Sequence, residues 1–156
     1  SELGFAEVYL NNQNIEKAIR TLEVSSFVSK VAAVSEVRKK LVAIQQQIGK
    51  NKGVVMDGRD IGTVVFPDAE LKIFMTASAE TRAQRRYKEL IERGDDVVYD
   101  SVLKNVQERD HLDSTRKDSP LVKADDAIEI DNSNLSLQEQ FEKVLQLVIM
   151  TIEDTE

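Results

Sequence analysis

The sequence predicts a layered α/β protein in which parallel strands are flanked by helices. Three short apolar runs, at 54–56, 71–75 and 127–130, are typical of strands buried in a parallel sheet. Segments with helical spacing of apolar residues lie around and between these runs, and strands that alternate with helices favour a layered α/β core. The length of 156 residues suits one ordinary domain.

The first element expected along the chain is a short strand or hairpin arm. Apolar residues alternate at Phe5, Val8 and Leu10, and Asn11 with Asn12 then offers a turn. No partner strand precedes this segment, and an isolated hairpin arm is marginally stable. We therefore expect that the partner strand is absent and that the chain was cut inside a larger protein.

Two helices are expected to follow and to form a helical hairpin. Between Thr21 and Ala33 the apolar residues recur at intervals of three and four, which gives one helical face. Ser35 is a residue type favoured at N-caps, and the apolar period that follows it continues until Gly49, a residue type favoured at the C-terminal ends of helices.

The second half of the chain is expected to contain three more helices. Two of them, at about 78–93 and about 100–113, lie between the second and third predicted strands. Ser136 and Glu139 have the spacing of a capping box, which opens the final helix.

Composition excludes several classes of function. The formal net charge of −7 argues against a surface that coats nucleic acid, because such surfaces cluster Lys and Arg against phosphates. No apolar run approaches the roughly 20 residues that span a bilayer. The sequence has no cysteine, which favours an intracellular setting. We expect a cytoplasmic protein that binds neither membranes nor nucleic acid.

The densest chemical signal is GVVMDGRDIGTVVFPDA, residues 53–69. A predicted strand ends there in Asp57, Gly58, Arg59 and Asp60, and the carboxyl ends of parallel strands are where α/β proteins bind ligands. Arg59 offers a planar fork for phosphate, and Asp60 accepts hydrogen bonds from an amino group or a cationic partner. A turn with a surface ion pair is the alternative interpretation.

The same segment nearly matches a Walker A loop, because Gly53 and Gly58 are followed by Arg59. The residues between the two glycines favour a strand, whereas a phosphate cradle needs a loop followed by Lys and Ser or Thr. We therefore reject a phosphate loop here, and no other segment of the sequence supplies one.

The second signal is QERDHLDSTRKDSPL, residues 107–121. Arg109, Asp113 and Arg116 follow one another at spacings of four and three, so on one helical face they would converge. Two guanidinium groups with a carboxylate between them suit phosphate and a sugar hydroxyl. A solvated helix face with local ion pairs is the alternative. We interpret His111, the only histidine, as a surface residue.

These two segments resemble the signature stretches of bacterial cytidylate kinases. That family's pattern includes DGRD-x-GTVVFPDA and, later, ERD-x-x-D-x-x-R followed by PL, and the sequence contains both. SKVAAVSEVRKKL, residues 29–41, is similar to the helix pair of the family's insertion that binds the nucleoside monophosphate, and the likeness runs from about residue 15 to near the end.

The resemblance implies a nucleoside-monophosphate-kinase-like core that is incomplete at its N-terminus. Residues 1–50 would form part of the monophosphate-binding insertion, and residues 51–156 the rest of the parallel-sheet core, with a mobile lid at about 107–121. The resemblance implies a substrate site in which the first four of the following residues surround cytosine and phosphate and the last three contact ribose and phosphate: Ser29, Arg38, Arg59, Asp60, Arg109, Asp113 and Arg116.

The implied activity of the complete enzyme is transfer of the γ-phosphoryl group of Mg²⁺–ATP to CMP or dCMP, giving CDP or dCDP. Arg109, Arg116 and Arg59 would offset charge on the transferring group. Asp57 resembles a position that holds Mg²⁺ through water, with a structural turn as the alternative. Arg85 and Arg86, on a basic helix face with Arg82, would contact the nucleotide cofactor or remain solvated.

The family's N-terminal glycine-rich phosphate loop is missing from the sequence, so we expect this chain alone to be inactive. A second hypothesis is a non-catalytic folded fragment that binds a cytidine nucleotide weakly or not at all. A third, an acidic helical interaction module, depends on composition alone, and the paired Arg and Asp strings argue against it.

Overall fold

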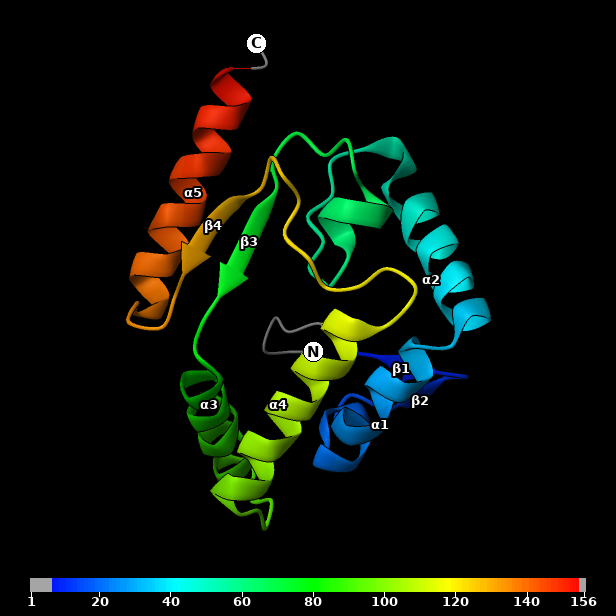
Figure 1. Ribbon diagram of the computed structural model, residues 1–156, viewed down its shortest axis with the longest axis vertical. Coiled ribbons are helices and arrows are strands. Elements are labelled where there is room, and N and C mark those ends of the chain that lie inside the picture. Colours follow the sequence, from blue (N-terminus) through cyan, green and yellow to red (C-terminus); the bar gives the residue numbers. More distant parts are fainter. Residues whose placement is uncertain (1–6, 155–156) are drawn as a thin grey trace.

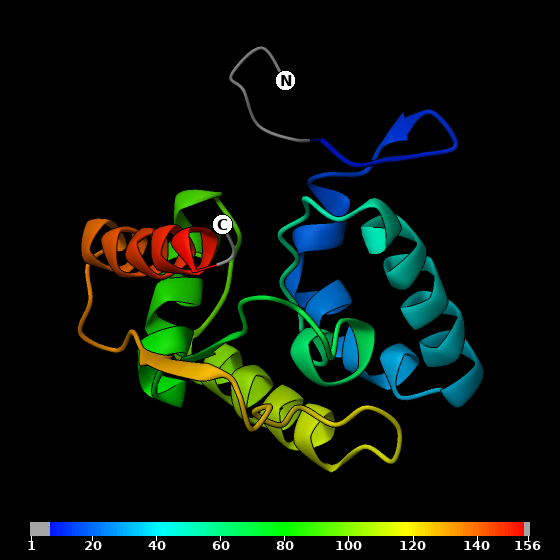
Figure 2. The same ribbon diagram turned by 90° about the horizontal axis from the view of Figure 1, so that it is seen from above.

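The structure is a computed structural model that describes residues 7–154. Its α-helices in this range are α1 (Leu22–Ala32), α2 (Ser35–Ile48), α3 (Ala79–Glu92), α4 (Tyr99–Thr115) and α5 (Leu137–Glu153). The strands are β1 (Tyr9–Leu10), β2 (Gln13–Asn14), β3 (Ile73–Thr76) and β4 (Ile128–Asp131). Short helical turns are η1 (Ala18–Arg20), η2 (Gly49–Asn51) and η3 (Ile61–Val65). Figures 1 and 2 show that α5 and the pair α1–α2 lie on opposite sides of the molecule.

The N-terminal hairpin forms as the turn residues predict, but its partner strand is present. β1 pairs with β2 in antiparallel register, Tyr9 opposite Asn14. Asn11 and Asn12 have φ of 49° and 64°, the left-handed conformation that two-residue hairpin turns require. The expectation of an absent partner is therefore wrong, because residues just after the turn supply the strand. Phe5 lies outside the described residues.

The helix pair is confirmed, with a different start for its second member. Thr21 caps α1 by accepting a hydrogen bond from the backbone N–H of Val24. Ser35 is not the N-cap of α2; Val34 occupies that position, and the Ser35 hydroxyl instead donates to the carboxylate of Asp118. The prediction at Ser35 failed because a tertiary partner took the hydroxyl that a local cap would use.

Gly49 ends α2 as predicted, and its lack of a side chain has a packing reason. Its φ of −81° is ordinary for any residue. A Cβ added there would overlap the ring of Phe66, which follows the η3 turn. Gly49 therefore allows the end of α2 to pack directly on the segment that carries the first chemical signal.

The predicted strand at 54–56 is wrong. This segment has no strand pairing in the structure, and Val55 is fully exposed. A strand is held by hydrogen bonds to a neighbour, and within residues 7–154 no other strand lies beside this run. The apolar pattern alone therefore did not suffice.

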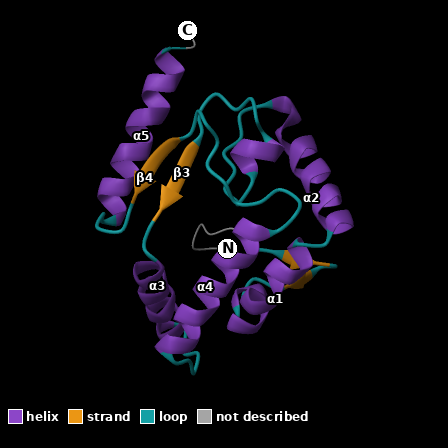
Figure 3. Ribbon diagram, viewed as in Figure 1, coloured by secondary structure: helices purple, strands orange, loops and turns teal. Residues whose placement is uncertain are grey.

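The other two predicted strands are confirmed as a parallel pair. β3 and β4 align with Ile73 opposite Ile128 and Met75 opposite Ile130. Figure 3 shows these two strands between the surrounding helices. The described part of the chain is thus mostly helical, with a small parallel sheet and a short hairpin.

The best-buried apolar core lies between α3 and α4, the two helices that the sequence placed at 78–93 and 100–113. Ala83 and Leu90 of α3 and Val102 of α4 are fully buried. Each buried large apolar side chain contributes about 1.5–3 kcal/mol. The rings of Tyr87 and Tyr99 meet edge to face with centroids 5.9 Å apart. The buried core and the Tyr87–Tyr99 contact hold α4, which carries the second chemical signal, against α3.

α5 begins with the predicted capping box and is the least packed helix. The Ser136 hydroxyl accepts from the backbone N–H of Glu139, and the Glu139 carboxylate accepts from the backbone N–H of Ser136. Leu137 and Phe141 on this helix are nevertheless exposed. Within residues 7–154, no helix is long and apolar enough to span a membrane.

Candidate functional site

The two chemical signals meet in space, together with the start of α2. Arg38 comes from the first turn of α2, Arg59 and Asp60 from the segment just before η3, and Asp113 and Arg116 from the C-terminal end of α4. Asp60 and Asp113 are 2% and 3% exposed, and Arg38 and Arg116 are each 8% exposed. We call these five residues the Arg–Asp cluster.

Asp60 is held by arginines from two different elements. Nη1 of Arg38 donates to its carboxylate oxygens at 3.2 and 3.3 Å. Nη2 of Arg116 lies 3.9 Å from Oδ1 of Asp60, close enough for an ion pair but not for a hydrogen bond. Asp60 thus connects α2 to the end of α4.

Asp113 takes the equivalent place on the other side of Arg116. Its Oδ2 accepts a hydrogen bond from Nε of Arg59 at 3.0 Å, and its Oδ1 lies 3.6 Å from Nη1 of Arg116. The Arg116 guanidinium is therefore flanked by two carboxylates and hydrogen-bonded to neither. Its Nε donates to the backbone carbonyl of Ser119 at 2.7 Å.

The cluster has an excess of positive charge and unused donors. Three arginines face two aspartates, and both Nη1 and Nη2 of Arg116 are buried without a hydrogen-bond partner in the described part of the chain. Burial lowers the pKa of Arg116, and the charge of Arg38 lowers it further. Unsatisfied buried donors are costly. An anion such as a phosphate group would satisfy them, and arginine matches its geometry.

Arg109 lies beside the cluster rather than inside it. Its Nη1 donates to the hydroxyl of Ser25 on α1 at 2.9 Å, while its buried Nε has no partner among residues 7–154. Burial lowers the pKa of Arg109, followed by the charge of Arg59. Ser29, one turn further along α1, is 3% exposed. The predicted face of Arg109, Asp113 and Arg116 therefore divides, since Arg109 turns toward α1.

The loop after α4 connects the cluster to α2. The backbone N–H of Leu121 donates to the carbonyl of Asp113 at 2.7 Å, and Asp118 accepts from Ser35 at the start of α2. Figure 2 shows this loop reaching from the end of α4 toward α2. His111 is exposed on α4, as expected.

The remaining predicted positions lie apart from the cluster's hydrogen bonds. Asp57 is exposed and has no partner among the described residues. Arg85 donates to the side chain and the carbonyl of Asn132 at 3.0 and 2.6 Å, just after β4. Arg86 donates to Glu89 and to the carbonyl of Arg20.

Sequence reasoning missed Ser25 and Asn105. The Asn105 side chain is 9% exposed and bonds to Ser25 and Ser26 across the α1–α4 contact. A signal was available, because Ser25 and Asn105 each lie four residues before a predicted site residue and so share its helical face.

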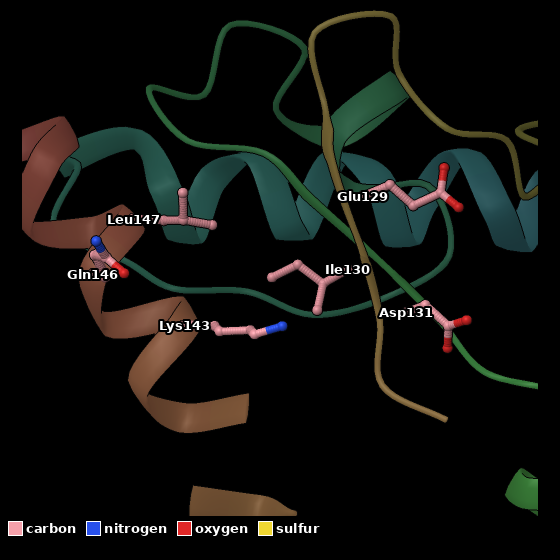
Figure 4. A pocket seen from close by; sticks show the side chains of 6 residues that line it. All are labelled: Glu129, Ile130, Asp131, Lys143, Gln146 and Leu147. Carbon is pink, nitrogen blue, oxygen red and sulfur yellow. The ribbon is translucent and has the colours of Figure 1, made fainter. Parts of the chain in front are cut away.

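Two surface hollows lie outside the cluster. Figure 4 shows the first, a cavity of about 290 Å³ between β4 and α5 that is lined by Glu129, Ile130, Asp131, Lys143, Gln146 and Leu147. The second, of about 500 Å³, is lined by Lys30, Gln107, Glu108, His111 and Leu112. Neither hollow is lined by a residue of the Arg–Asp cluster. The buried, unpaired donors of Arg116 are a stronger indication of a ligand site than the size of either hollow.

The described fold is mostly helical with a small parallel sheet, and between its helices it holds buried arginine donors of the kind that bind anions. Comparison with known proteins makes this specific. The profile of the cytidylate kinase family matches residues 1–150, and the chain belongs to that family.

Relatives bear out the match and show how much of it this chain covers. The cytidylate kinase of Flavobacterium johnsoniae is 72% identical over 148 residues, which are 95% of this chain and 64% of that protein. That of Flavobacterium psychrophilum is 71% identical over 94% of this chain and 65% of its own length. The cytidylate kinase of Bacteroides fragilis is 60% identical over 90% of this chain and 62% of its own length. The chain thus spans less than two thirds of the relatives' length.

Proposed function

We propose that the complete protein transfers the γ-phosphoryl group of ATP to CMP or dCMP, and that the chain described here supplies the site for that acceptor nucleotide. Membership of the cytidylate kinase family supports the reaction. The single observation that carries the site is Arg116, a buried guanidinium between two carboxylates whose two terminal nitrogens have no hydrogen-bond partner in the described chain.

The acceptor's phosphate would bind to Arg59, Arg109 and Arg116. Arg59 is held by Asp113, and its side chain remains 43% exposed, so it can reach a ligand from the surface. In-line attack by a phosphate oxygen needs no covalent intermediate. The arginines would hold the attacking oxygen in position and offset charge on the transferring group, which is where most of the rate gain in phosphoryl transfer arises.

Recognition of the cytosine would fall to Ser29, Arg38 and Asp60. Asp60 already accepts from Arg38, and a carboxylate has further lone pairs for an amino group. Since Arg38 fixes the Asp60 carboxylate, the base reader would be preorganised before nucleotide binds. Asp113 would orient Arg59 and Arg116 and accept from a ribose hydroxyl.

Mg²⁺ would act with ATP, and Asp57 is the residue proposed to hold it through water. Residues 7–154 contain no group of three acidic, histidine or cysteine side chains that would bind a metal without help. One exposed carboxylate still fits, because Mg²⁺ usually combines one or two carboxylates with phosphates and waters. When bound, the ion would neutralise phosphate charge.

The proposed division of the chain follows the same family. Residues 1–50 would belong to the monophosphate-binding insertion and 51–156 to the nucleoside-monophosphate-kinase core, with a lid at about 107–121 that excludes water during transfer. Arg85 and Arg86 are proposed contacts of the ATP side. A cytoplasmic location remains part of this proposal.

A coupled assay of ADP release tests the activity. We would join this chain to the third of the Flavobacterium johnsoniae protein that the alignment leaves unmatched, and use the intact relative as positive control. We expect CMP-dependent turnover in the joined protein and CMP binding without turnover in this chain alone. An inactive joined protein beside an active control would refute the proposal.

A further inference from the structure

A chain of hydrogen bonds runs from Arg109 across the α1–α4 contact. Nη1 of Arg109 donates to Oγ of Ser25 at 2.9 Å, and Oγ of Ser25 donates to Oδ1 of Asn105 at 3.1 Å. Nδ2 of Asn105 donates to Oγ of Ser26 at 2.9 Å. The Ser26 hydroxyl in turn donates to the carbonyl of Leu22 at 2.8 Å.

The direction of these bonds is fixed by counting protons. A serine hydroxyl has one proton, and Ser26 donates it to Leu22, so its oxygen must accept from Asn105. That places the amide nitrogen of Asn105 toward Ser26 and its oxygen toward Ser25. Ser25 then donates its one proton to Asn105. The lone pairs of the Ser25 hydroxyl oxygen are therefore free to accept from Arg109.

Packing alone does not explain a polar side chain at position 105. Asn105 is 9% exposed, and its neighbours Val102 and Val106 belong to or pack against the apolar core between α3 and α4. A buried amide adds stability only while it is fully hydrogen-bonded, and an apolar residue of similar size would fill the space without that condition. The amide is therefore best accounted for by what it holds.

We propose that Ser25 and Asn105 are positioning residues that hold Arg109 with one edge against α1 and its unpaired Nε available to the phosphate of the acceptor nucleotide. The inference rests on the proposed function, since it assigns Arg109 to that phosphate. It ties α1, which carries Ser29, to the helix that carries Asp113. Base-side and phosphate-side groups are thereby held in one arrangement.

The first test compares nucleotide affinities of variants by calorimetry. Ser25→Ala removes the acceptor for Arg109, and Asn105→Leu replaces the amide by an apolar side chain with the same branching and number of heavy atoms. We expect each to weaken CMP binding about tenfold, less than the full worth of a hydrogen bond to a charged group. Binding of cytidine, which has no phosphate, should be unchanged. Ser25→Thr, which keeps the hydroxyl, should restore CMP affinity.

Gln107→Ala is the matched control, because Gln107 is an exposed amide on the same helix whose side chain makes no hydrogen bond within residues 7–154. It should leave both affinities unchanged. A merely structural role for Asn105 would lower CMP and cytidine affinity together or lower the melting temperature alone, and either result would overturn the proposal.

A second readout does not need CMP. The Nε–H signals of arginine side chains are visible by NMR, and Arg109→Lys assigns the one that matters. Ser25 holds the Arg109 guanidinium through Nη1 and the Nε–H is buried, so this proton should exchange slowly with water. Ser25→Ala and Asn105→Leu should each release the side chain and speed that exchange severalfold, whereas Gln107→Ala should not. Unchanged exchange in both variants would refute the positioning role. Failure of the unaltered chain to bind CMP would refute the proposed function instead, and the exchange rates would still decide this inference.

Discussion

At Arg116, burial and charge act against the stability of the folded chain. The side chain is only 2% exposed, and its two terminal nitrogens face carboxylates at 3.6 and 3.9 Å without hydrogen-bonding to them. If Arg116 is removed, Asp60 still has its ion pair with Arg38, and Asp113 still has its ion pair with Arg59. We therefore propose that Arg116 serves ligand binding rather than stability.

We therefore predict that Arg116→Met separates binding from stability. CMP affinity should fall at least about tenfold, because hydrogen bonds to charged groups contribute about 1.5–3 kcal/mol. The melting temperature should stay equal or rise, since a buried cation with two unsatisfied donors is replaced by an apolar side chain and only the hydrogen bond from Nε to the Ser119 carbonyl is lost. Lys104→Met, which removes an exposed charge from the same helix, is the control. Lower stability with unaltered CMP affinity would contradict the interpretation of Arg116.

The seven substrate-site positions were named from two sequence strings and a helix pair, and the structure brings five of them into one bonded cluster. The spacing of Arg109, Asp113 and Arg116 predicted a shared helical face, which holds only in part. Arg116 lies past the last turn of α4, and Arg109 bonds to Ser25. Spacing gives the direction in which a side chain leaves the helix, but the partner on another element decides where it ends.

At the scale of elements, Gly49 determines how α2 meets the η3 turn. The ring of Phe66 occupies the space that any side chain at Gly49 would need. Asp60 is the N-cap residue that precedes η3, so this contact helps to place a carboxylate of the site. The small size of Gly49 therefore affects where Phe66, η3 and the adjoining Asp60 lie.

Gly49→Ala should destabilise the protein by about 1–3 kcal/mol, the usual cost of overpacking. The measurement is denaturant unfolding followed by circular dichroism. Gly62→Ala is a matched control, because a Cβ there would make only ordinary contact, at 3.4 Å, with the flexible side chain of Lys72. Equal stabilities of the two variants would show that Phe66 moves without cost.

The capping box of α5 predicts a pH dependence. Hydrogen bonds from Ser136 lower the pKa of Glu139 below its ordinary 4.5. A carboxylate whose folded pKa is lowered contributes stability above the unfolded value, and this contribution is lost as the pH falls through the folded pKa. In thermal melts, we expect the unaltered chain to have a higher melting temperature than the Glu139→Gln variant above pH 4.5. The difference in melting temperature should shrink as the pH falls below that value. A constant difference across that range would exclude the ionised cap.

The helices were predictable because their signals are local. Thr21, Ser78 and Ser136 all cap the helices that the apolar period had placed. The conformation of the run at 54–56 was not predictable in this way, because a strand needs a neighbouring strand and the local pattern does not reveal one. Ser35 failed for a similar reason, as Asp118 lies 83 positions away in the sequence.

At the scale of the whole molecule, apolar burial is unevenly distributed over the described helices. α3 and α4 share the buried core, while α5 leaves Leu137, Phe141 and Leu145 exposed at four-residue intervals on one face. Figure 1 shows α5 at the edge of the molecule, beside β4. Nothing in the local pattern of α5, which reads as an ordinary amphipathic helix, distinguishes it from a packed one.

Amide hydrogen exchange should therefore divide the helices. Backbone amides of α5 should exchange much faster than those of α3 and α4, because little apolar burial opposes their local opening. Mass spectrometry on proteolytic fragments would measure it, with α3 as the internal reference. Protection of α5 as strong as that of α3 would contradict the packing described here.

The central proposal is that the Arg–Asp cluster and Arg109 bind cytidine monophosphate, with Arg59, Arg109 and Arg116 on its phosphate. Calorimetric titration of this chain with CMP, and in parallel with cytidine and AMP, tests it most directly. We predict saturable binding of CMP at one site, with weaker binding of cytidine, which lacks the phosphate, and of AMP, which has the wrong base. Absence of CMP binding, or equal affinities for CMP and cytidine, would contradict the account.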